Sequence, residues 1–116
     1  MAYSEQLADR LRTYLSRVSD IEVEEKKMFR GLAFLVNDKM CVNVSGDNLM
    51  CRFDPDLQEE LENKAGFQTV KMAGRFMKGF GYISEEGYRD PKDFQYWVEL
   101  ALEFNPRARS SKKTKK

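Results

Sequence analysis

The feature that most constrains the fold is the apolar density within residues 24–53, whose sequence is EEKKMFRGLAFLVNDKMCVNVSGDNLMCRF. Three runs rich in apolar residues, 26–36, 40–44 and 49–53, alternate with two short polar segments, 37–39 and 45–48. Asn, Asp and Gly in those segments suit the positive φ angles of tight turns. This pattern predicts three short strands joined by two hairpin turns. The first strand should be covered on both sides, since both of its alternating faces are apolar.

Helix signals flank this strand-rich stretch. Ser4 can cap a first helix that extends to about residue 18. Asp54-Pro55 and Asp90-Pro91 each place a capping residue before a proline at the first helical position, which predicts a helix ending at Gly66 and a last helix ending near residue 105. Segments 67–72 and 76–83 are predicted to be the fourth and fifth strands. The predicted order is α-β-β-β-α-β-β-α, a single antiparallel sheet of about five strands with helices packed on it, in the α+β class.

Length and charge indicate one domain followed by a tail. The chain has 116 residues and a net charge of +1, and a single domain of this size can bury its own core. Residues 107–116 contain six basic residues and no acid. We therefore predict a domain over residues 1–106 and a disordered basic tail over 107–116, because the tail has too few apolar side chains to offset the entropy of ordering. The tail either attracts nucleic-acid phosphates or serves only as a solubilising end.

Composition also predicts the compartment. The apolar runs are too short to span a bilayer, and the N-terminus lacks the apolar core of a secretory signal, so we expect a cytoplasmic protein without a membrane partner. The two cysteines, Cys41 and Cys51, are then expected to be free and buried. Six methionines, several on predicted strands, also suit a homodimer that uses a sheet edge or a methionine-rich strand face.

The residue types exclude several kinds of catalytic site. Histidine is absent, which removes the Ser-His-Asp triad, Cys-His pairs and histidine metal sites. The glycines in segment 74–81 lack the lysine of a phosphate loop and the third glycine of a dinucleotide turn. We predict no catalytic, metal or cofactor residue and no enzymatic activity. The alternative is a small ligand-binding or thiol-dependent enzyme domain that uses Cys41 or Cys51, which requires a stabilised thiolate.

Aromatic side chains alternate along the fifth predicted strand. Phe76, Phe80 and Tyr82 should share one strand face, with Arg75 and Lys78 interleaved. Such a face is typical of a sheet covered by a helix, and it is also how single-stranded nucleic acid is held.

Several segments together resemble a known family. They are KKMFRGLAF at 26–34, Lys39-Met40-Cys41, the strand at 49–52, MKGFGYI at 77–83 and the aromatic last helix. Their order and spacing, over about residues 3–105, are similar to the N-terminal domain of the TfoX/Sxy competence regulators. Three positions depart from the family pattern: Arg30 and Asp38 stand where glycines are usual, and Phe76 where a proline is usual.

The resemblance implies a bacterial regulatory or interaction module without catalytic residues. Well-known family members are transcriptional coactivators of competence genes, and they carry a second, helical C-terminal domain. We therefore expect this chain to bind a protein of the transcription apparatus or nucleic acid. The candidate contacts are cations near the apolar strands and in the tail: Lys26, Lys27, Arg30, Arg75, Lys78, Arg107, Arg109, Lys112 and Lys113.

Overall fold

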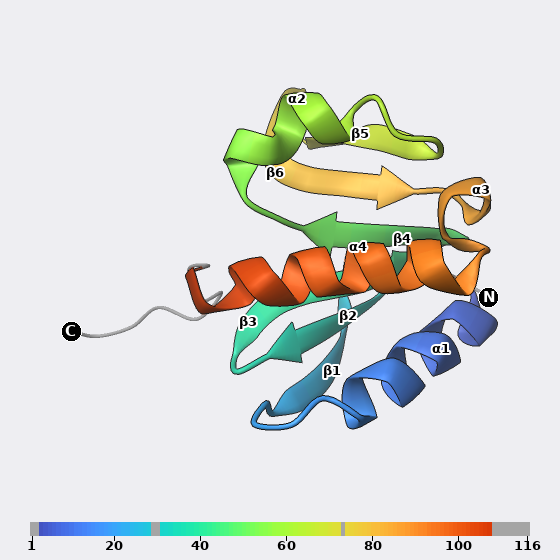
Figure 1. The fold of residues 1–116 in the computed structure, drawn as a ribbon, viewed down its shortest axis with the longest axis vertical. Helices are drawn as coiled ribbons and strands as arrows, with labels where there is room; N and C mark the ends of the chain where they lie inside the picture. The colour runs from blue at the N-terminus through green and yellow to red at the C-terminus, as the bar shows by residue number, and fades with distance from the viewer. Residues whose placement is uncertain (1–2, 29–30, 73, 108–116) are drawn as a thin grey trace.

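The computed structural model describes residues 3–28, 31–72 and 74–107. Within these ranges the chain forms six strands and four α-helices, with two short 3₁₀ turns, η1 and η2 (Figure 1). In chain order the elements are α1 (Glu5–Ser16), β1 (Val23–Met28), β2 (Gly31–Val36), β3 (Lys39–Ser45), β4 (Asn48–Arg52), η1 (Pro55–Leu57), α2 (Gln58–Leu61), β5 (Phe67–Met72), β6 (Arg75–Ile83), α3 (Glu85–Tyr88), α4 (Pro91–Phe104) and η2 (Asn105–Arg107).

The strands form one antiparallel sheet in the order β1-β2-β3-β4-β6-β5. This confirms the predicted α+β class and element order, with one strand more than expected. The extra strand arises because segment 26–36 is not a single strand. Lys26 pairs with Ala33 and Lys27 with Leu32, so the chain reverses between β1 and β2. The short helix α3 is a second addition to the predicted order.

The composition of β1 and β2 explains why they separate. All side chains of β1 from Val23 to Lys27 are exposed, whereas every residue of β2 is buried. At the start of β2, a Cβ atom on Gly31 would lie 1.9 Å from the backbone oxygen of Val44 in β3, so only glycine allows β2 and β3 to approach this closely. The charged edge strand β1 and the buried inner strand β2 pair up to Met28 and Gly31.

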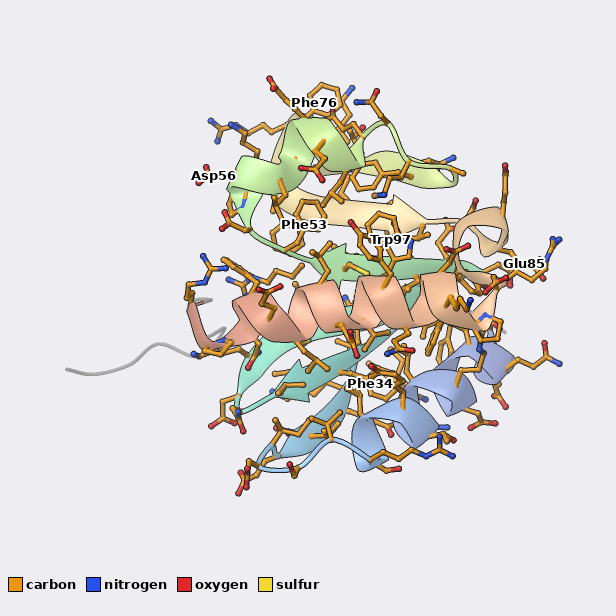
Figure 2. The ribbon with its side chains drawn as sticks, viewed as in Figure 1. Phe34, Phe53, Asp56, Phe76, Glu85 and Trp97 are labelled. Carbon is orange, nitrogen blue, oxygen red and sulfur yellow. The ribbon has the colours of Figure 1, made fainter. Side chains whose placement is uncertain are left out.

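All the described helices lie on one face of the sheet, and α1 and α4 cross it side by side (Figure 1). Each buries one side: Leu7, Leu11 and Leu15 of α1, and Phe94, Trp97, Val98 and Ala101 of α4. Figure 2 shows Phe34, Phe53 and Trp97 in this layer. None of the described helices has both the length and the apolar composition needed to cross a bilayer.

The opposite face of the sheet, which we call the open face, has no described helix over it. Cross-strand partners share a face, so the register places Lys26, Ala33, Asn43, Met50, Tyr82 and Gln68 in one row across all six strands of this face. Ala33, Leu35 and Met50 are nevertheless almost fully buried, and they lie outside the main core cluster. The sheet therefore has a second, smaller apolar layer on its open face.

Candidate interaction surfaces

The candidate cations lie at opposite sides of the sheet. Lys26 and Lys27 are exposed on β1, whereas Arg75 and Lys78 are exposed on β6, four strand positions away. Because neighbouring strands lie ~4.8 Å apart, the two groups are separated by roughly 19 Å. Lys26 and Lys27 also point to opposite faces, since their cross-strand partners alternate. The structure does not assemble these four cations into one site.

The remaining candidates belong to the tail or to the segment between β1 and β2. Arg107 donates from Nη1 to Asp54 Oδ2 at 2.9 Å, and its guanidinium carbon lies 5.2 Å from the centre of the Phe104 ring. This residue therefore binds the domain itself. Arg30, Arg109, Lys112 and Lys113 lie outside the described residues, as does the rest of the predicted tail, 108–116.

A groove of about 600 Å³ lies between α2 and the hairpin of β5 and β6. We call it the hairpin groove; its lining residues are Gln58, Glu59, Glu62, Phe67, Thr69, Phe76, Met77 and Lys78. Phe76 is 70% exposed, more than any other large hydrophobic residue that the structure describes. It lies at the outer end of the molecule (Figure 2). The ammonium of Lys71 is 5.4 Å from the centre of its ring.

A break in the strand pairing projects this end of the hairpin beyond the core. Thr69 pairs with Gly81, but Lys71 already pairs with Phe76, so β6 contains extra residues between these points. Gly79, at φ +88°, lies in this bulge. Its N–H donates to the buried Gln58 Oε1 at 2.9 Å, and its carbonyl accepts the Phe53 N–H at 2.8 Å. Both bonds fix the bulge to α2 and to the end of β4.

The bulge also separates the aromatic residues of β6, contrary to the single face that their alternation predicted. Tyr82 pairs with Met50 on the open face, and Phe80 pairs with Arg52, whose guanidinium carbon is 5.7 Å from the Phe80 ring centre. Both rings are half-buried. Phe76 instead lines the hairpin groove with Phe67, so an extra run of residues has changed the side of the strand to which this ring points.

The two thiols are in a setting opposite to that of a reactive cysteine. Cys41 and Cys51 are free and buried. Burial raises the pKa of Cys41 to about 12, although nearby Arg52 acts in the other direction. Burial likewise raises the pKa of Cys51 well above its ordinary value. Both thiols are therefore protonated at neutral pH, which gives the thiol-dependent alternative no support.

The structure places the methionines of the proposed homodimer face, and it tests whether acidic and cysteine side chains gather into a metal site. Met50 is buried and Met40 half-buried on the open face, whereas Met77 lines the hairpin groove. The structure does not describe the side chains of Met28 and Met72. Across the described part of the chain, no group of three cysteine or carboxylate side chains is close enough to hold a metal ion.

Sequence reasoning missed one polar group, the side chain of Asn43. It is 2% exposed on the open face, and its Nδ2 lies 3.5 Å from Met40 Sδ and 3.7 Å from Met50 Sδ. Its Oδ1 is buried and has no hydrogen-bond partner. The available signal was an asparagine at a central position of the apolar strand MCVNV.

Fold and surfaces together define a small α+β domain with one antiparallel sheet, an exposed aromatic hairpin and no assembled catalytic group among its described residues. The TfoX N-terminal domain family matches residues 13–105, and the chain belongs to this family. The resemblance seen in the sequence motifs is thereby confirmed. No curated protein and no solved structure matches the chain.

Proposed function

We propose that this chain is a non-enzymatic regulatory module that binds a protein of the transcription apparatus, in the control of competence-type genes. The observation that carries the proposal is Phe76, an aromatic ring 70% exposed beside a groove of about 600 Å³. A large aromatic side chain next to a concave, partly apolar surface is typical of the anchor of a protein interface. Membership of the TfoX N-terminal domain family supports the regulatory part.

The charges around the hairpin groove favour a partner with acidic residues. Lys71, Arg75 and Lys78 surround Phe76, and none of them forms an ion pair with a described carboxylate. Glu59 and Glu62 line the α2 side of the same groove. A partner that places acids toward the hairpin and an apolar side chain in the groove would match the cationic rim and the groove itself, and such matching determines orientation and the rate of encounter.

The two alternatives have weaker support. A nucleic-acid function through the tail has no contribution from Arg107, whose guanidinium is already paired with Asp54. A thiol-dependent activity requires a thiolate, and burial raises the pKa values of both cysteines. Protein binding through the hairpin requires neither a rearrangement of the core nor a cysteine with a lowered pKa.

The test is photo-crosslinking in the cells from which the protein comes. A photo-reactive phenylalanine analogue replaces Phe76 in one version and Tyr96 in a control, because Tyr96 is a partly exposed aromatic residue of α4. We expect position 76 to capture a component of the transcription apparatus and position 96 to capture none. Equal capture from both positions, or capture of no transcription protein at position 76, would contradict the proposal.

A charge-reversal pair separates the two groups of cations. Replacing Arg75 and Lys78 by glutamate should reduce the crosslinked product at least tenfold, since both cations flank Phe76. Replacing Lys26 and Lys27 by glutamate, roughly 19 Å away, should leave its yield unchanged. The opposite result would place the interface on β1.

A further inference from the structure

The open face holds a polar atom that the described fold leaves unsatisfied. Asn43 Nδ2 has only the thioether sulfurs of Met40 and Met50 as partners, and sulfur is a weak acceptor. Asn43 Oδ1 is buried without any partner. A buried carbonyl oxygen without a donor destabilises a fold, so such an atom calls for a functional reason.

A cation without a counter-ion lies beside this amide. Arg52 is half-buried on the same face, and its Nη1 donates a long hydrogen bond of 3.4 Å to the Met40 backbone oxygen. No carboxylate of the described residues pairs with it. Burial lowers the pKa of Arg52, and the nearby Cys41 thiol acts in the opposite direction. The guanidinium therefore has unused donors in a partly desolvated place, which favours an anion.

Because of a bulge in the sheet, the Asn43 amide and the Arg52 guanidinium both contact Met40. The register of β2 and β3 shifts between Phe34 and Leu35, so Leu35 pairs with Met40 while Ala33 pairs with Asn43. Met40 and Asn43 are three residues apart, yet both lie on the open face because of this shift. The amide contacts the Met40 sulfur and the guanidinium contacts the Met40 carbonyl. One flexible, half-buried methionine therefore contacts the amide nitrogen through its side chain and the guanidinium through its backbone.

We propose that the open face binds an acylated amino-acid end, meaning a carboxylate that carries an amide N–H on the adjacent carbon. The carboxylate pairs with the Arg52 guanidinium, whose planar fork matches two carboxylate oxygens. The amide N–H donates to Asn43 Oδ1, and an apolar side chain of the ligand lies against Leu35 and Met50. The Met40 thioether swings aside to admit the ligand, as an unbranched side chain with several rotatable bonds can do.

Two sources present this chemistry: a free N-acyl amino acid and the C-terminal end of a polypeptide. The site is separate from the hairpin groove, because Asn43 and Arg52 belong to the open face whereas Phe76 points toward α2. It does not depend on the proposed function.

The test is a titration of the full ¹⁵N-labelled chain, followed by NMR of the Asn43 side-chain amide and the Arg52 Nε–H. The probe is N-acetyl-L-leucine. We expect saturable shifts of both groups with a Kd of about 1 mM, a normal affinity for so small a ligand. N-acetyl-L-leucinamide lacks the carboxylate and 4-methylpentanoate lacks the amide, so each should bind at least tenfold more weakly.

Two variants locate the binding. Asn43→Leu removes the unpartnered oxygen while keeping the volume, so it should leave the chain folded and equally or more stable, with affinity reduced at least tenfold. Arg52→Met, at a half-buried position, should weaken binding by a similar factor. Lys92→Gln, on the exposed side of α4, is the control and should bind as the original chain does.

Several results would overturn the proposal. They are the absence of saturable shifts up to about 20 mM probe, equal binding of the acid and its amide, and unchanged affinity in either variant. Shifts of the same resonances with protein concentration alone would show that a second copy of the chain covers the open face. An acetylated hexapeptide ending in leucine distinguishes the sources: tighter binding than N-acetyl-L-leucine identifies a polypeptide end, and equal binding a free ligand.

Discussion

Asp54 connects two distant parts of the chain through one carboxylate. Its Oδ1 accepts the backbone N–H of Asp56 at 2.9 Å and so caps η1, while its Oδ2 accepts from Arg107 Nη1 at 2.9 Å. The Asp56 N–H, and then Arg107, lower the pKa of Asp54 below its ordinary 3.8. The ionised side chain thus holds η2 against the start of η1.

This arrangement predicts a contribution to stability that depends on acid. Since the folded-state pKa of Asp54 is lower than its unfolded value, the contribution is complete above about pH 4 and is lost as pH falls through the folded pKa. Asp54→Asn keeps a capping oxygen but not the charge. We expect its melting temperature to be lower than that of the original chain at pH 7 and the difference to shrink by pH 2. Thermal unfolding at both pH values measures this, and a constant difference would contradict it.

Residue-scale features were predictable where they depend on near neighbours in sequence. Ser4, Asp54 and Asp90 were all predicted to be caps, and each side chain accepts a backbone N–H two or three residues further on. Asn43 and Phe76 were not predictable in this way. Their environments depend on which residues of other strands lie beside them, and no local pattern encodes that register.

At the scale of elements, period-two alternation located strands but not reversals of direction. The bounds of β5 were predicted correctly as 67–72. Segment 26–36 was wrongly predicted to be one strand, because apolar alternation continues through it without a recognised turn pair. The missing Cβ of Gly31 allows its contact with Val44 of β3, but it does not encode the reversal between β1 and β2. The effect of the bulge at Gly79 on Phe76 depends on the pairing of β5 with β6, which no local pattern shows.

The bulge predicts unequal costs for two glycine substitutions. Gly79→Ala introduces a side chain at φ +88° and places its Cβ 3.1 Å from the Phe53 oxygen, whereas Gly74→Ala, at φ +79°, meets no atom within 4 Å. Backbone strain of this kind costs about 1–3 kcal/mol. We expect Gly79→Ala to lower the unfolding free energy by that amount or more and Gly74→Ala by clearly less, in urea denaturation. Equal losses would mean that the crowding at Gly79 is unimportant.

At the scale of the whole molecule, two layers of unequal thickness follow from the chain order. The helices gather on one face, so the core is built between α1, α4 and the inner strands. The sequence predicted the helices and their apolar sides. It did not predict that all of them would cover one face, because covering both faces satisfies the same apolar pattern.

The charge of the molecule predicts how DNA binding should depend on the tail. Residues 108–116 contain five of the twenty basic residues and no acid, so residues 1–107 carry fifteen basic and nineteen acidic residues, a net −4. We expect a chain ending at Arg107, which keeps its pair with Asp54, to lose binding to a labelled DNA duplex. The full chain should bind weakly and lose affinity steeply with salt, as phosphate contacts do. Fluorescence anisotropy at several salt concentrations measures both; binding that survives truncation would place a DNA surface on the domain.

The two margins of the sheet differ in what they can accept. The β1 margin carries Glu24, Glu25, Lys26 and Lys27, all exposed, and such a charged strand resists pairing with another chain. The β5 margin has fewer charges and lies beside Phe76. Growth of the sheet is therefore possible in one direction only. A guest strand at β5, whether from another protein or from a second copy, would use the single available position, so assembly would stop at a pair and could not propagate into a filament.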